Sequence, residues 1–261
     1  MFTVTYAQLN AWLTAFLWPF TRIAALVAAA PVLGHASLPA RVKIGLAAFI
    51  TLIVAPTLPS MPQVTVFSAA GVWVLVMQLL IGAALGFAMQ LVFAAVEMAG
   101  TLVGLQMGLG FATFFDPSSN ASAQVISSFL NMIAMIAFLT FNGHLQMISA
   151  LIGSFQSVPI AAAVYGPPGM RTLVEWGGAI FSAGLLLSLP VVIALLVANL
   201  SLGILNRAAP QIGIFQIGFS VTLMVGMLLL LLMLPNMIPF FARLIDAGVD
   251  EMGRVAAALH G

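Results

Sequence analysis

The residues that could carry chemistry are few and lie far apart. His35, His144 and His260 show no spacing typical of metal ligands, and the carboxylates are dispersed along the chain. No nucleophile-elbow motif is present. The chain has no cysteine, which excludes disulfides, thiol chemistry and the commonest structural zinc sites. The residue types therefore predict no enzyme, no metal site and no cofactor.

Two ionisable residues, Arg22 and Glu97, stand inside apolar runs. A charge in such a run costs several kcal/mol unless it is paired or faces water. We expect Arg22 and Glu97 to be buried charges that satisfy each other, or matching charges on a neighbouring subunit, or to line a pore. The alternative is that each lies near a helix end and extends its charged group to the membrane interface.

Small residues recur at helical spacing in the same part of the chain. Gly100, Gly104 and Gly108 follow each other every four residues, and Gly82 and Gly86 form a similar pair. Glycines at this spacing lie on one face of a helix and let another backbone approach closely. We expect these faces to pack against other helices and to serve assembly with partner subunits.

Apolar bulk sits on a flexible backbone directly after these glycines. Gly108 and Gly110 lie within a run that ends at Asp116 and Pro117, where proline cannot continue a helix. The apolar side chains of this run are Met107, Phe111, Phe114 and Phe115. One interpretation is a hydrophobic constriction that closes a pore by excluding water. The other is a loop that packs onto its own helices.

Composition indicates an integral membrane protein. Of 261 residues, 63% are hydrophobic and 5% are charged, which is too few charged groups to cover a soluble protein of this size. Strand-like alternation is missing, so helices are the predicted way to satisfy the backbone in lipid. The basic residues are scattered, which argues against a nucleic-acid partner.

Apolar runs and breakers divide the chain into long helices. Runs are predicted at about residues 9–30, 44–58, 67–111, 123–141 and 144–155. The second of these is short for a crossing, and the third is long enough that we favour two helices with a bend. Asn142 and Gly143 predict a kink, and the prolines between residues 157 and 169 predict a loop.

The last third of the chain reads as a helical hairpin followed by a tail. Two apolar runs, at about 173–205 and 215–245, are joined by a segment that contains Arg207, Pro210 and Gln211, which we place at the hairpin tip. Residues 246–261 predict a short polar tail in water or at the interface.

Three groups of residues together resemble the FliR/SpaR family of type III export-gate proteins, and the resemblance spans nearly the whole chain. The first group is the segment 22–31 with Gly34, Pro39, Arg41 and Lys43; the second is Glu97, Gly100, Gly104, Gln106, Gly108, Ala112, Asp116 and Pro117; the third is Arg207, Pro210, Gln211, Phe215, Gly218, Phe219 and Gly226. Asn142-Gly143-His144 resembles the flagellar branch more than the injectisome branch. Ser220 departs from the proline that the family commonly has there.

The resemblance implies a subunit of the flagellar export gate in the bacterial inner membrane, at the flagellar basal body. It would assemble with FliP, FliQ and FlhB in contact with membrane lipid, and unfolded flagellar proteins would pass through it. It implies one all-α, polytopic membrane domain with a FliP-like part at about residues 1–170 and a FliQ-like hairpin at about 171–245. The family's plug maps to about Gly108 to Ser119. The alternative is a self-contained transporter of small solutes, for which paired charges and two related halves would be the signs.

Overall fold

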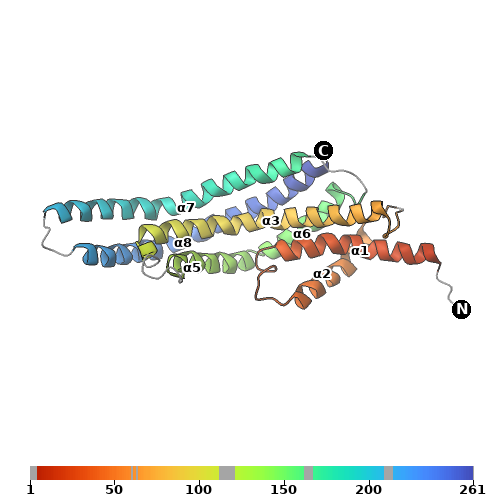
Figure 1. Ribbon diagram of the computed structural model, residues 1–261, viewed down its shortest axis with the longest axis horizontal. Coiled ribbons are helices and arrows are strands. Elements are labelled where there is room, and N and C mark those ends of the chain that lie inside the picture. The colour runs from red at the N-terminus through yellow and green to blue at the C-terminus, as the bar shows by residue number, and fades with distance from the viewer. Residues whose placement is uncertain are drawn as a thin grey trace. The chain divides into compact units, whose positions relative to one another are not determined.

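The computed structural model describes residues 5–59, 61–62, 64–111, 121–161, 167–208 and 214–260. Within these ranges the chain forms helices and no strand, so the all-α prediction is confirmed. In chain order the elements are α1 (Tyr6–Ala29), α2 (Ala40–Val54), the 3-10 helix η1 (Ala55–Thr57), α3 (Ala69–Gln106), the 3-10 helix η2 (Leu109–Phe111), α5 (Ala121–Thr140), α6 (Gly143–Ser157), α7 (Pro167–Ala208) and α8 (Ile214–His260) (Figure 1).

Most of these helices are long and apolar enough to cross a membrane. Among the residues that the structure describes, α1, α2 together with η1, α3, α7 and α8 each meet the requirements of length and composition. Helices α5 and α6 form one further candidate, a pair bent by 66°. The chain is therefore a polytopic membrane protein, as its composition predicts.

Local signals fix the ends of α1. The backbone N–H of Gln8 donates to Thr5 Oγ1 at 3.4 Å, and the backbone N–H of Thr5 donates to Gln8 Oε1 at 3.1 Å. This reciprocal pair is a capping box, which satisfies N–H groups that the first turn leaves free. The helix ends at Ala29, just before Pro31, where proline disfavours helical geometry in the preceding residue.

Helix α3 differs from the prediction of two helices with a bend. It runs without a break for 38 residues, from Ala69 to Gln106. No proline lies within it, and Gly82, Gly86 and Gly100 are placed where neighbouring helices come close. The helix ends where Gly108 adopts a positive φ of 85° and its N–H donates to Leu105 O at 3.0 Å. A left-handed glycine just past the last turn is a common helix stop, because glycine takes positive φ without steric cost.

The kink predicted at Asn142 is present between α5 and α6. Asn142 has a positive φ of 57°, a conformation that asparagine tolerates better than most residues. This residue precedes α6 and marks the 66° bend.

Helices α7 and α8 are longer than the apolar runs predict. They continue through Pro190, Pro235 and Pro239 without a break. Residues 246–260, expected to form a short polar tail, continue α8 as its last turns. Met252, Val255 and Ala256 are buried there, at the three- and four-residue spacing of one helix face. This buried apolar face stabilises helix where the charged residues alone indicated a tail.

The chain divides into two compact units. Unit 1 comprises Met1–Leu91, Asn142–Gly177 and Ile245–Gly261, and unit 2 comprises Val92–Phe141 and Gly178–Leu244. The core of unit 1 includes Trp18, Leu26, Leu85 and Phe155. In unit 2, the ring of Phe93 meets the ring of Phe138 edge to face, with centroids 5.6 Å apart.

Candidate functional site

Arg22 lies in the core of unit 1 and is fully buried. Its Nε donates to Gln78 Oε1 on α3 at 2.7 Å. Its Nη1 donates to the Ser154 carbonyl at 2.9 Å and to Ser154 Oγ at 3.2 Å, and its Nη2 donates to the Val158 carbonyl at 2.9 Å. The guanidinium also lies 4.3 Å from the centre of the Phe155 ring. One side chain thus joins α1, α3 and the end of α6.

The position of these acceptors explains how a charge is held here. Ser154 lies in the last turn of α6, and Val158 is its C-cap. The Ser154 carbonyl also accepts the backbone N–H of Val158 at 2.8 Å, whereas the last four carbonyls of a helix, which include that of the C-cap, lack partners in the helix and carry the negative end of its dipole. A guanidinium presents its donors in a planar fork and attracts the face of an aromatic ring. Arg22 therefore caps α6 from a different helix.

The expected pairing of Arg22 with Glu97 requires correction. The bonds described above join Arg22 to neutral oxygens of its own unit. Glu97 belongs to unit 2 and is exposed, so in the chain alone it is not a buried charge. The physical reason is that carbonyl oxygens at a helix end can satisfy a guanidinium without a carboxylate. That Glu97 meets a charge on a neighbouring subunit stays a prediction.

Gln78 is a partner of Arg22 that the sequence interpretation missed. It is fully buried, and its Oε1 accepts the hydrogen bond from Arg22. Trp176 was also missed: its Nε1 donates to the carbonyl of Ala88 at 2.9 Å and joins α7 to α3 in unit 1. A signal for Gln78 was available, because an amide inside an apolar run demands a polar partner.

The glycine faces make contacts inside the chain. In unit 1, a Cβ added at Gly82 would meet the Arg22 carbonyl and, at 2.9 Å, Ala25 Cβ. A Cβ added at Gly86 would lie 2.7 Å from Ala29 Cβ. Helix α3 therefore uses its glycine pair to approach Ala25 and Ala29 of α1, which repeat at the same four-residue spacing.

In unit 2 a glycine of α3 likewise lets α5 approach closely. A Cβ added at Gly100 would meet the backbone of Ser127, and Gly104 is buried. Gly82, Gly86 and Gly100 therefore serve close packing between helices of the same chain, as expected of glycines at this spacing. That these faces also serve assembly with partner subunits stays a prediction.

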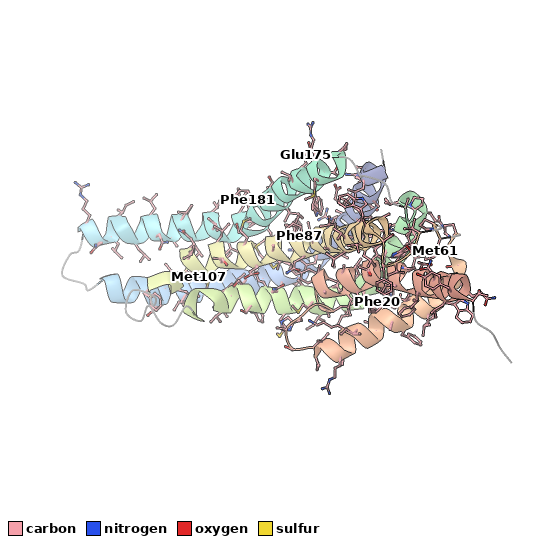
Figure 2. The ribbon with its side chains drawn as sticks, turned by 45° about the vertical axis from the view of Figure 1, so that its right-hand side comes forward. Phe20, Met61, Phe87, Met107, Glu175 and Phe181 are labelled. Atoms are coloured by element: carbon pink, nitrogen blue, oxygen red, sulfur yellow. The ribbon has the colours of Figure 1, made fainter. Side chains whose placement is uncertain are left out.

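The candidate plug begins at the end of α3. Met107, which is labelled in Figure 2, is fully buried. Gly108 forms the turn, and Gly110 and the backbone of Phe111 belong to η2. Thr222 Oγ1 on α8 lies 3.2 Å from the Met107 carbonyl, to which it can donate. Phe114, Phe115, Asp116 and Pro117 lie outside the described residues.

The candidate hairpin tip is described only in part. Arg207 lies in the last turn of α7 and is exposed, whereas Pro210 and Gln211 lie outside the described residues. In unit 2, Leu202 of α7 and Gly218 of α8 lie near each other, since a Cβ at Gly218 would be 3.8 Å from Leu202 Cδ1. The two helices therefore pack together near this end.

A cluster of metal ligands does not appear in the part of the chain that the structure describes. No group of three or more His, Cys, Asp or Glu residues is placed there to hold a metal ion. The arrangement described above can hold helices together and fix the start of a loop.

Comparison with known proteins identifies relatives along nearly the whole chain. A family model described as bacterial export proteins, family 1, matches residues 13–248. The chain is 49% identical over 248 residues to the flagellar biosynthetic protein FliR of Pectobacterium carotovorum subsp. carotovorum, covering 95% of each chain. It is 47% identical over 244 residues to FliR of Escherichia coli (strain K12), covering 94% of this chain and 93% of the relative. FliR of Bacillus subtilis (strain 168) is 27% identical over 246 residues, covering 93% and 95%.

Proposed function

Because the chain belongs to the family of bacterial export proteins, family 1, and is a membrane-embedded component of the flagellar export apparatus, we propose that it is a structural subunit of the export gate. In this role it forms part of the channel through which unfolded flagellar proteins leave the cytoplasm. It lies in the bacterial inner membrane at the flagellar basal body. The observation that carries the proposal is the match over residues 13–248 together with two flagellar relatives near half identity.

We further propose that its partners are FliP, FliQ and FlhB. Much of α7 and α8 in unit 2 is apolar and exposed in the chain alone, for example at Leu200, Met224 and Leu231. Such surface requires lipid or neighbouring subunits to cover it. Within this assembly, residues 1–170 would act as the FliP-like part and residues 171–245 as the FliQ-like hairpin, with Arg207, Pro210 and Gln211 at its tip.

The proposal is tested by replacing the fliR gene of a motile Escherichia coli strain with the gene for this chain. We expect export of flagellar proteins into the medium to be restored, because the two proteins match over 94% of this chain. Affinity purification of this chain should recover FliP and FliQ in one particle, whose mass gives the copy numbers. A chain that inserts into the membrane but purifies without them, and restores no export, would contradict the proposal.

We propose that the segment from Gly108 to Ser119 is the seal of this channel. Its support is the family resemblance together with the buried Met107 and the left-handed Gly108 at its start. Apolar side chains exclude water and ions when they pack inward, and a passing chain displaces such contacts more readily than a salt bridge. Phe111, Phe114 and Phe115 would supply this bulk, and Asp116 with Pro117 would anchor the far end.

Removing the apolar bulk of this segment is expected to open the gate to ions. In the variant with Phe111, Phe114 and Phe115 changed to alanine, or with residues 110–115 deleted, the complex should form but conduct without substrate. Conductance of the purified complex in planar bilayers measures this. The matched control changes the exposed Phe87 and Phe181 to alanine. If the intact variant complex conducts no more than the parent, the seal lies elsewhere.

The proposed role includes no catalysis. A self-contained small-solute transporter is not favoured, because the family match and the flagellar relatives indicate an export component. Arg22, the buried cation that such a transporter could use, is held by oxygens within unit 1.

A further inference from the structure

Helix α8 holds the end of α3 at a glycine, whose lack of a side chain leaves room for a side chain from α3. Gly226 of α8 is buried, and a Cβ added there would lie 2.6 Å from Met107 Cγ, 2.9 Å from Met107 Sδ and 2.8 Å from Met107 Cε. Real Cβ atoms do not approach that closely, so only glycine leaves room for the Met107 side chain in this position. Met107 itself is fully buried.

The same helix also takes up a backbone group of Met107. The last carbonyls of a helix have no partner within the helix. Thr222, one turn before Gly226, places its hydroxyl 3.2 Å from the Met107 carbonyl and 3.0 Å from the Phe219 carbonyl. A helical threonine bonds readily to a carbonyl of its own preceding turn, so the second contact is local, whereas the first joins two helices. Thr222 is buried, which strengthens the need to satisfy the group that it meets.

We propose that Thr222 and Gly226 are positioning residues for the seal, and we call these two residues the α8 clamp. The clamp fixes Met107, the last residue before the left-handed Gly108, and so sets the point and direction at which the chain leaves α3. This inference rests on the proposed role of the segment that follows Gly108. It adds that the hairpin helix α8, which is distant in sequence, holds the near end of that segment.

The clamp predicts opposite effects for single and paired substitutions. Gly226→Val adds as many heavy atoms as Met107→Ala removes beyond Cβ, so the two changes together keep the volume at the contact. Gly226→Val alone should push Met107 from its place, and the pair should restore the fit, because volume-conserving changes in packed interiors are tolerated best. Thr222→Val should release the carbonyl with little change of shape, whereas Thr222→Ser should retain the bond.

Hydrogen–deuterium exchange of the peptide 103–111 in the purified complex measures the position of the α3 end directly. We expect Thr222→Val to speed exchange about fivefold, which corresponds to about 1 kcal/mol for one hydrogen bond. Gly226→Val should speed it more, and Met107→Ala added to it should return it toward the parent. Ion conductance of the same complexes should rise in the same order. The control is Gly203→Val on α7, where nothing lies within 4 Å of an added Cβ.

Every outcome of the exchange and conductance measurements either supports or overturns the α8 clamp. Unchanged exchange for Thr222→Val in an intact complex overturns the clamp, and so does a pair of changes that exchanges as fast as Gly226→Val alone. If Gly226→Val prevents assembly, Thr222→Val and its serine counterpart decide alone. Deletion of residues 110–115 in the same assay keeps the two proposals separate. Leak after deletion with unchanged exchange in the clamp variants refutes the clamp only. Faster exchange in the clamp variants without leak after deletion refutes the seal only.

Discussion

Arg22→Ala is expected to lower the stability of unit 1 more than any other single truncation in its core. The change leaves Gln78 Oε1 and the Val158 carbonyl buried without the donor that they share, while the Ser154 carbonyl keeps the Val158 N–H and loses only its second donor. A buried acceptor that loses its partner costs about 1–3 kcal/mol, so the first two together should cost several. The cavity left by the side chain and the loss of its contact with the Phe155 ring act in the same direction.

The measurement is the recovery and melting temperature of the complex purified through a tag on this chain. Arg22→Lys should recover only part of the loss, because a single ammonium cannot span acceptors on two helices as a planar fork does. Arg41→Ala is the matched control, since Arg41 is an exposed arginine at the start of α2. Equal recovery and melting for Arg22→Ala and Arg41→Ala would mean that the Arg22 bonds contribute nothing measurable.

The charged residues show what sequence reasoning can and cannot predict. The demand for a partner at Arg22 follows from its position in an apolar run, and the structure supplies that partner. Its identity did not follow, because backbone carbonyls at a helix end are available wherever a helix stops and leave no mark in the sequence. Gln78 could have been found, since a lone amide in an apolar helix needs a bond. The exposure of Glu97 depends on which face of α3 is covered, and no single-helix pattern fixes that.

The positions of the helices were predicted better than the residues at which they begin and end. Apolar runs and breakers located each helix, since the length of a membrane crossing is set by the bilayer. α3 is one helix and not two, because glycines that meet a neighbouring helix at close range do not need to break the helix. The last turns of α8 were taken for a tail because charged residues masked the buried spacing of Met252, Val255 and Ala256. Packing against the rest of unit 1 decided that segment, and composition could not.

The assignment of the segment from Gly108 to Ser119 as a seal rests more on the family resemblance than on any physical pattern in the sequence. Glycine and phenylalanine next to each other predict an apolar loop as readily as a plug, and the resemblance alone distinguished the two. Its described start, Met107 to Phe111, adds a constraint that no pattern contained: Gly226 and Thr222 lie 115 or more residues further along the chain. Contacts at such separations follow from the fold and from no local signal.

The glycine pair on α3 allows a test that depends only on whether a glycine-to-alanine change raises or lowers the stability of the protein. Glycine inside a helix is usually worse than alanine by about 0.5–1 kcal/mol, because it loses more backbone freedom on folding. Gly82→Ala should nevertheless destabilise the protein, by about 1–3 kcal/mol, since its Cβ would press on the Arg22 carbonyl and on Ala25 Cβ. The backbone of α1 cannot yield there without moving the guanidinium of Arg22 from its acceptors.

Gly45→Ala on α2 is the matched control, because nothing lies within 4 Å of an added Cβ at that exposed position. It should leave the melting temperature of the purified complex unchanged or raise it, while Gly82→Ala lowers it. Combining Gly82→Ala with Arg22→Ala should cost less than the sum of the two, since both act through the same contact between α1 and α3. A melting temperature raised equally by both glycine changes would show that α1 and α3 have room between them, and that Arg22 is positioned by other contacts.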